Sequence, residues 1–451
     1  MIIRNTSDLL SHGNIYGRKI ALDVIECALK SIDSYEATKK FIQIKDNREL
    51  LVGDLRRDFS QVGKIYVVGG GKAAFPIARW LDEILGERIK EGVIVVKRGE
   101  HRRLKNIRVI EGGHPIPDED GLEGAKQILK IAEKAKKGDI VFCIVTGGVS
   151  ALVPLPARGI TLDDKKRVNK LLLMCGSRID EINTVRNHIS DIKGGKLAKY
   201  IHPAEIINLI VIDEVAGVPW GPCVPDTTTF KDAIQVLKKY DLWRKSPKSV
   251  KEYLDNGLRD SKDETLKQKD FKNLKVQNVI LANNGIICEA ARKRSVELGF
   301  NSIIVSTTIE GESREVGVEL ANVARRIKDH SSLVKTPCTL IIGGETTVSI
   351  LGQHGKGGPS QELALSFSLK IAGDENITLA SIDTDGTDGP TEIAGGVTDG
   401  YTLERIKKKG LDLHSHLMKH NSSRVLCELG DAILTEPTET NVMDLNVIVI
   451  T

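Results

Sequence analysis

The sequence predicts an α/β protein in which short buried strands alternate with helices around a doubly wound sheet. The candidate strands are short, almost entirely apolar and rich in Ile and Val, as in parallel strands that helices cover on both faces. Amphipathic helical stretches separate them, and glycine-rich turns follow several of them. This alternation implies right-handed strand–helix–strand crossovers.

The elements of the first half follow this pattern in order. Residues 17–32 have helical periodicity, with Ile20, Val24 and Ala28 on one face. Four strands are expected at 65–68, 93–96, 140–145 and 206–212, with helices at 121–136 and 161–176 among the segments between them.

The second half repeats the pattern after a strongly polar stretch at 243–275, which we interpret as exposed helix and linker. Strands are expected to return at 278–282, 302–305, 338–342, 378–382 and 446–450. A chain of 451 residues is longer than one hydrophobic core usually serves. We therefore expect an N-terminal domain at 1–245, a polar linker at 246–275 and a C-terminal domain at 276–451.

Composition narrows the class of protein. The chain is 40% hydrophobic and 28% charged, which is typical of a folded protein. A net charge of +4 is too balanced for a dedicated nucleic-acid or membrane-surface protein. No apolar run approaches the roughly 20 residues that span a bilayer, and the N-terminus lacks a signal-peptide pattern. Seven scattered cysteines without a Cys-x-x-Cys pair disfavour disulfides and structural zinc. We expect a cytoplasmic protein that binds a small molecule.

Two glycine turns follow predicted strands of the first half. In the first, Gly69, Gly70 and Gly71 precede Lys72 and a helix, so that backbone N–H groups, the helix N-terminus and a lysine could all meet an anion. Its spacing fits neither a Walker P-loop nor the dinucleotide fingerprint. The second turn contains Gly147, Gly148 and Ser150, at the strand end where open α/β sheets bind ligands. Tight turns without a ligand are the alternative for both.

Charged residues follow these turns. Arg186 and Lys193 lie in a basic segment, TVRNHISDIKGGKLA at 184–198, and could hold a carboxylate; a solvated basic helix end is the alternative. Asp213 and Glu214 directly follow a predicted buried strand, where they could bind Mg²⁺ or accept a proton.

The second half has its own candidates. Gly343, Gly344 and Glu345 follow a predicted strand, and Lys356, Gly357 and Gly358 precede a predicted helix. Asp385 lies in an acidic strand-end turn whose spacing does not match a calcium-binding EF-hand loop. We expect this turn to contact Mg²⁺ or a nucleotide.

Eight motifs in this order resemble the glycerate 2-kinase family of the MOFRL type. They are VVGGGKAA at 67–74, GGHPIPDEDG at 112–121, GGVSAL at 147–152, VRNHISDIKGGKLA at 185–198, VPDTTTF at 224–230, IIGGETTV at 341–348, TDGTDGPTEIAGG at 384–396 and PTETNVMDL at 437–445. The resemblance covers nearly the whole chain. It implies a Rossmann-like N-terminal domain, a smaller C-terminal α/β domain and an active site in the cleft between them. It also implies phosphate transfer from ATP to the 2-hydroxyl of D-glycerate.

The resemblance assigns roles to individual residues. Lys72 matches the family's catalytic lysine and would neutralise charge on the transferred phosphoryl group. Asp213 matches the acid of a strand-end motif and would accept the substrate proton or bind Mg²⁺ beside Glu214. Arg186 and Lys193 are the expected substrate ligands. The expected nucleotide ligands are Gly69, Gly70, Gly71, Gly147, Gly148, Ser150, Gly343, Gly344, Glu345, Lys356, Gly357, Gly358 and Asp385.

The chain departs from the family pattern around the expected cleft. Pro359 stands where the family has an active-site arginine, and we expect Lys356 to supply the missing charge. The segment Thr435–Asn441 lacks two of the family's glycines. A kinase for another small sugar acid, a hydroxypyruvate reductase and a non-catalytic metabolite sensor therefore remain alternatives. The expected partners are substrate and nucleotide, and a homodimer is left open.

Overall fold

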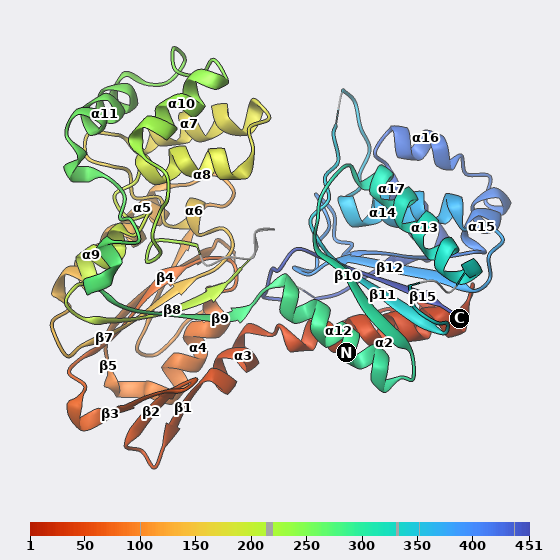
Figure 1. Ribbon diagram of the computed structural model, residues 1–451, viewed down its shortest axis with the longest axis horizontal. Coiled ribbons are helices and arrows are strands. Elements are labelled where there is room, and N and C mark those ends of the chain that lie inside the picture. Colours follow the sequence, from red (N-terminus) through yellow and green to blue (C-terminus); the bar gives the residue numbers. More distant parts are fainter. Residues whose placement is uncertain (100, 213–219, 331–332, 351, 437) are drawn as a thin grey trace. The chain divides into compact units, whose positions relative to one another are not determined.

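The computed structural model describes residues 1–99, 101–212, 220–330, 333–350, 352–436 and 438–451. The chain forms two compact units (Figure 1). The parallel-sheet unit contains Ser34–Val211 and Pro219–Leu281, and the mixed-sheet unit contains Met1–Asp33 and Ala282–Thr451. The two units are named here after their main sheets.

These units differ from the predicted domains in two ways. The first 33 residues belong with the second half of the chain, because helix α2 (Ile15–Ser31) packs on the mixed sheet. The segment 246–275 was predicted as a polar linker with exposed helix. It contains helix α11 (Lys248–Arg259), whose apolar side chains Val250 and Leu254 are buried against neighbouring helices.

The parallel sheet has the strand order β6-β5-β4-β7-β8-β9, and the strands from β6 to β8 pair in parallel. Its strands are β4 (Ile65–Gly70), β5 (Ile89–Lys97), β6 (Arg108–Gly112), β7 (Ile140–Val145), β8 (Glu205–Val211) and β9 (Lys275–Ala282). The order reverses at the centre, since β5 and β6 extend to one side of β4 and β7 and β8 to the other. Every residue of β4 and β7 is buried, which confirms their prediction from apolar runs.

Helices cover this sheet on both faces. Helices α5 and α9 pack on one face over Val95 and Val68, and α4 lies on the other (Figure 1). The helices of the unit are α3 (Ser34–Phe41), α4 (Ala74–Leu85), α5 (Glu119–Lys134), α6 (Val149–Leu152), α7 (Leu162–Met174), α8 (Ile179–His188), α9 (Lys196–Ile201), α10 (Phe230–Lys239) and α11. Helices α7, α8, α10 and α11 share a separate apolar core. A small antiparallel sheet is formed by β1 (Ile42–Lys45), β2 (Glu49–Val52) and β3 (Leu55–Asp58).

The mixed sheet has the order β10-β11-β15-β12-β13-β14. Its strands are β10 (Asn301–Ile309), β11 (Cys338–Gly344), β12 (Ile377–Asp383), β13 (Gly395–Asp399), β14 (Ala432–Ile433) and β15 (Asp444–Ile450). The final strand β15 enters antiparallel between β11 and β12. An α/β second half is confirmed, but the apolar runs were interpreted as parallel strands, whereas the pairings of β12, β13, β14 and β15 are antiparallel.

Helices also cover both faces of the mixed sheet. Helices α2 and α12 lie side by side on one face, and α13 and α14 lie on the other (Figure 1). The helices are α1 (Thr6–Leu9), α2, α12 (Asn284–Glu297), α13 (Ser313–His330), α14 (Pro359–Lys370), α15 (Thr402–Lys408), α16 (Leu413–Met418) and α17 (Ser422–Leu429).

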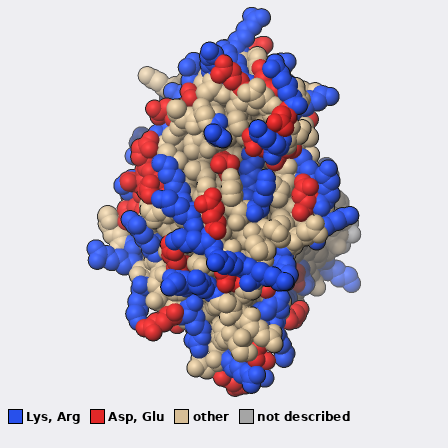
Figure 2. Space-filling view, turned by 90° about the vertical axis from the view of Figure 1, so that its left-hand side faces the viewer, with Lys and Arg blue, Asp and Glu red and all other residues tan. Residues whose placement is uncertain are grey.

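On the face shown in Figure 2, acidic side chains are interspersed among more numerous basic ones. Among the described helices, none is both long and apolar enough to cross a membrane.

Candidate active site

The ends of β4 and β7 bring the first two glycine turns together. The backbone N–H of Lys72 donates to the carbonyl of Gly147 at 2.7 Å, and the N–H of Ala73 donates to Thr146 Oγ1 at 3.1 Å. The strand order reverses between these two strands, and such a point in an open α/β sheet leaves a crevice for ligands. The glycine turns that follow β4 and β7 therefore lie next to each other.

Two glycines are required by this close approach. At Gly71, with φ +132°, a Cβ atom would lie 2.0 Å from Thr146 Oγ1. At Gly148, with φ +84°, it would lie 2.9 Å from a ring carbon of His114 and 3.4 Å from Lys72 Cγ. His114 thus lies beside Lys72 and Gly148. The motif GGHPIPDEDG contains this histidine, but its spacing gives no sign of the contact.

The basic segment reaches the second turn through one lysine. Lys193 is buried, and its Nζ donates to the hydroxyl of Ser150 in α6. Arg186 lies on α8, where its Nε donates to Asn169 Oδ1 at 3.3 Å. The structure thus brings Lys193, Ser150 and the Lys72 turn into one region of the parallel-sheet unit, while Arg186 contacts Asn169 of α7.

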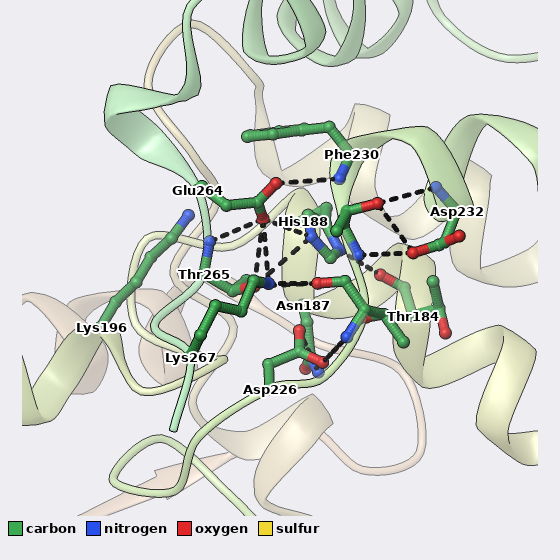
Figure 3. Close-up of polar contacts among 12 residues, drawn as sticks. Thr184, Asn187, His188, Lys196, Asp226, Phe230, Asp232, Glu264, Thr265 and Lys267 are labelled. Atoms are coloured by element: carbon green, nitrogen blue, oxygen red, sulfur yellow. Dashed lines mark hydrogen bonds and ion pairs between the residues drawn. The ribbon is translucent and has the colours of Figure 1, made fainter. Parts of the chain in front are cut away.

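His188 of the basic segment pairs with Glu264, which is partly buried (Figure 3). His188 Nδ1 lies 2.7 Å from the carbonyl of Thr184, and Nε2 lies 2.8 Å from Glu264 Oε1. Burial opposes ionisation of Glu264, but the hydrogen bond and charge of His188 and the N–H groups of Phe230 and Thr265 lower its pKa to about 2. Both ring nitrogens of His188 therefore lie within hydrogen-bonding distance of an oxygen atom.

The VPDTTTF motif supports the same segment. Asp226 accepts from Asn187 Nδ2 at 3.2 Å and from the N–H of Thr228 at 3.0 Å. At Gly194, with φ +61°, a Cβ atom would lie 2.5 Å from Thr265 Cγ2, so this turn is pressed against the chain that carries Glu264. Figure 3 shows Lys196 extending along that chain. Contacts from distant parts of the sequence therefore fix the backbone of residues 187–196.

A second group of predicted residues meets in the mixed-sheet unit. The register of β15 places Asp444 opposite Gly344 on one side and opposite Asp383 on the other. Burial raises the pKa of Asp444 well above its usual value, and the charges of Asp383, Asp388 and Glu345 raise it further. This strand end is therefore rich in carboxylates that repel one another.

Contacts within the mixed-sheet unit account for the glycine at the turn before α14. The carboxylate of Asp388 accepts from the N–H groups of Ser360 at 3.2 Å and Gln361 at 2.9 Å, and burial raises its pKa to about 7. A Cβ atom at Gly358 would lie 2.3 Å from Asp388 Cγ. Pro359 is the first residue of α14, where a missing N–H removes no helical hydrogen bond.

Other predicted nucleotide ligands also pack within this unit. A Cβ atom would lie 2.2 Å from Ser422 Oγ at Gly357 and 1.7 Å from Asn284 Oδ1 at Gly343. The side chain of Lys356 is exposed, and its carbonyl accepts from the N–H of Ser423 at 3.1 Å. Close packing is sufficient to account for these two glycines, and a contact with nucleotide stays a prediction.

The remaining predicted residues are acidic. Asp385 Oδ1 accepts from the N–H and hydroxyl of Thr387 at 2.9 and 2.8 Å, which closes the strand-end turn, and Glu345 is exposed. Asp213 and Glu214 lie outside the described residues. Within the ranges that are described, no group of three or more His, Cys, Asp or Glu side chains is placed to hold a metal ion.

A parallel sheet with glycine turns at the carboxyl ends of its central strands is typical of an α/β enzyme. Two family models match the chain: a domain of unknown function, DUF4147, over residues 20–255, and the MOFRL family over residues 338–444.

Several relatives align with nearly the whole chain. It is 43% identical over 437 residues to a glycerate 2-kinase of Pyrococcus horikoshii, covering 96% of this chain and 97% of that protein. It is 33% identical to a D-glycerate 2-kinase of Thermotoga maritima, covering 95% and 97%. A crystal structure of glycerate kinase from Thermotoga maritima superposes with a TM-score of 0.83 at 32% identity, covering 96% and 99%. A putative hydroxypyruvate reductase of Agrobacterium vitis is 34% identical, covering 86% and 100%. The chain therefore belongs to the glycerate 2-kinase family of MOFRL-type enzymes.

Proposed function

We propose that this protein transfers the γ-phosphoryl group of ATP to the 2-hydroxyl of D-glycerate, giving 2-phosphoglycerate, in the cytoplasm. The observation that carries the proposal is the meeting of Lys72 with the Gly147–Gly148 turn at the centre of the parallel sheet. The names of its relatives from Pyrococcus horikoshii and Thermotoga maritima support the same reaction.

Phosphoryl transfer depends mainly on positioning and on neutralising charge. The ammonium of Lys72 would stabilise negative charge on the transferred group, and the backbone N–H groups of the 147–150 turn would hold oxygen atoms. An oriented donor of this kind contributes on the order of 3 kcal/mol to a transition state. Lys193 and Arg186 would hold the carboxylate of the acid.

Mg²⁺ would accompany the nucleotide and neutralise charge on its phosphates. Protein sites commonly hold this ion through one or two carboxylates together with the phosphates of the substrate. Asp213 and Glu214 are the proposed ligands, with Asp213 as the alternative acceptor of the substrate proton. Asp383 and Asp444 lie opposite each other on the adjacent strands β12 and β15, and this carboxylate pair also suits a cation. Placement of the active site in a cleft between the domains stays a prediction.

Hydroxypyruvate reduction is the second candidate, because a relative from Agrobacterium vitis carries that name. The turn after β4 has Ala74 where the Gly-x-Gly-x-x-Gly fingerprint has its third glycine, and that position also accepts alanine, so this turn does not separate the two reactions. The names of the relatives from Pyrococcus horikoshii and Thermotoga maritima favour the kinase. The altered motifs around Pro359 favour a third candidate, a kinase for another small sugar acid.

The test incubates the purified full chain with ATP, Mg²⁺ and D-glycerate, and identifies the phosphorylated carbon by phosphorus NMR. The parallel assays use a panel of other sugar acids with ATP, and hydroxypyruvate with NADH or NADPH. Formation of 2-phosphoglycerate supports the proposal. Turnover of another acid alone, or oxidation of the nicotinamide alone, replaces it by the corresponding alternative. In the kinase assay, Asp213→Asn should lower kcat if this carboxylate is the proton acceptor, and weaken the Mg²⁺ dependence if it is a metal ligand.

A further inference from the structure

Three lysines are buried close together in the parallel-sheet unit, which is unusual for this residue type. Lys165 on α7 is 2% exposed, Lys193 is 8% exposed and Lys196 at the start of α9 is 6% exposed. Lys193 and Lys196 belong to the basic segment that the sequence singles out. Lys165 belongs to no motif.

Hydrogen bonds connect the three lysines to Ser190, directly or through the carbonyl of Leu155. Lys196 Nζ donates to the carbonyl of Ser190 at 2.8 Å, and the backbone N–H of Lys193 lies 3.3 Å from Ser190 Oγ. Lys165 Nζ donates at 3.2 Å to the carbonyl of Leu155, which also accepts from Ser190 Oγ at 3.0 Å. The three lysines therefore share one small network.

This network has more donors than acceptors at Lys165. The carbonyl of Leu155 also accepts from the N–H of Asp191 at 3.2 Å, so three donors share an oxygen that has two lone pairs. An ammonium group has three N–H bonds, and Leu155 O is the acceptor that the described part of the chain provides for Lys165. Its hydrogen-bonding capacity is therefore incompletely used in a buried place.

The charge around Lys165 is also unbalanced. Burial lowers its pKa well below the usual value, and the nearby charges of Lys193, Lys196 and Arg186 lower it further. Asp191 is the acid that opposes this effect, and burial raises the pKa of that carboxyl. Buried charge is unfavourable unless it is paired and hydrogen-bonded, and among the described residues Lys165 Nζ has one hydrogen-bond acceptor and no carboxylate within ion-pair distance. An oxyanion would supply both negative charge and acceptors.

We propose that Lys165, Lys193 and the Ser150 hydroxyl form the binding site for an oxyanion of the ligand, either a carboxylate or a phosphoryl group, with Lys196 adding charge behind them. Lys165 is thereby a ligand-binding residue. The inference deepens the proposed function, because Ser150 lies on the same turn as Gly147, whose carbonyl accepts from Lys72. It does not require that the ligand be D-glycerate.

The alternative is that Lys165 only holds the Leu155 carbonyl in place. Two substitutions separate the roles. Lys165→Met removes the charge and the donor but keeps most of the volume, whereas Lys165→Gln removes the charge and keeps an N–H donor. Lys166→Met is the matched control, since Lys166 is the next residue of α7 and its Nζ lies 3.6 Å from Asp163 at the protein surface.

The experiment measures thermal unfolding of each full-length variant alone and with D-glycerate, inorganic phosphate, ADP or neutral glycerol. In the unmutated protein we expect at least one anion to raise the unfolding temperature and glycerol to leave it unchanged. Both Lys165 variants should lose at least half of that shift, and without ligand they should unfold at the temperature of the unmutated protein or above. The Lys166→Met variant should keep the full shift.

Loss of the D-glycerate shift alone would assign the site to a carboxylate, and loss of the phosphate or ADP shift would assign it to a phosphoryl group. The proposal is overturned if no anion stabilises the unmutated protein, or if the anion shift survives in Lys165→Gln. It is equally overturned if both variants are less stable without ligand and keep the full shift. Because phosphate and ADP are tested directly, the result stands even if D-glycerate proves not to be a substrate.

Discussion

Arg18 and Asp431, which are 413 residues apart in the sequence, form a buried ion pair with 2.7 Å between Arg18 Nη1 and Asp431 Oδ1. Arg18 Nε also donates to Asp399 Oδ2 at 2.5 Å, and both carboxylates are fully buried. His12 and Arg405 provide further contacts to Asp431. This network fastens α2 to strand β13 and to the chain before β14, and explains why the N-terminal residues belong to the mixed-sheet unit.

Replacing Arg18 with Met should lower the free energy of unfolding by about 3–5 kcal/mol, because it leaves buried carboxylates without their shared partner. The measurement is urea denaturation followed by circular dichroism. Arg4→Met is the control, since Arg4 pairs with Glu436 at the surface and should contribute little. Equal stability of the two variants would mean that the buried pair does not hold α2.

Lys72 should act on turnover and leave the fold unchanged. We expect Lys72→Met to reduce kcat by about 100-fold or more, the loss typical of a group that stabilises charge in the transition state. The measurement is steady-state kinetics with ATP and D-glycerate, with circular dichroism to verify folding. The exposed Lys126 on α5 provides the control, as Lys126→Met. A near-normal kcat would remove Lys72 from the mechanism.

Glu264 should make stability sensitive to acid. Its pKa is about 2 in the folded protein and 4.5 as a free side chain, so the unfolded chain takes up a proton first as pH falls. The stabilisation by the His188–Glu264 pair should be complete above about pH 4.5 and be lost toward about pH 2. Unfolding free energies of the unmutated protein and Glu264→Gln should therefore converge over that range. The exposed Glu252→Gln should run parallel to the unmutated protein. A constant gap between wild type and Glu264→Gln would refute the ionised pair.

Lys356 should supply the charge that Pro359 does not. Lys356→Ala should raise the KM for D-glycerate or ATP by about tenfold, on the order of 1.4 kcal/mol of binding. The comparison is with Lys407→Ala, which removes an exposed lysine of α15. Unchanged KM and kcat would show that charge on this glycine turn is dispensable.

Local sequence patterns predicted many helices and strands, but they missed the burial of helix α11. Strand β7 has the predicted bounds, because a short apolar run rich in Ile and Val is typical of a strand that helices cover on both faces. The segment that contains helix α11 was predicted as exposed helix and linker, since Val250 and Leu254 are surrounded by charged residues. Their spacing of four places both on one helical face, where the neighbouring helices bury them.

By itself, the sequence determined the α/β class, the strand-end glycine turns and the family, because each of these depends on residues that are close together in the chain. Only the tertiary structure decided that the Lys72 turn meets the Gly147 turn, since this follows from the central position of β4 and β7 in the sheet order. It also decided that His114 lies beside Lys72, that Glu264 pairs with His188 and that Lys165 joins the basic segment. These residues carry no local spacing signal, because their partners come from strands and helices far away in the sequence, and packing alone sets which distant side chains share a buried site.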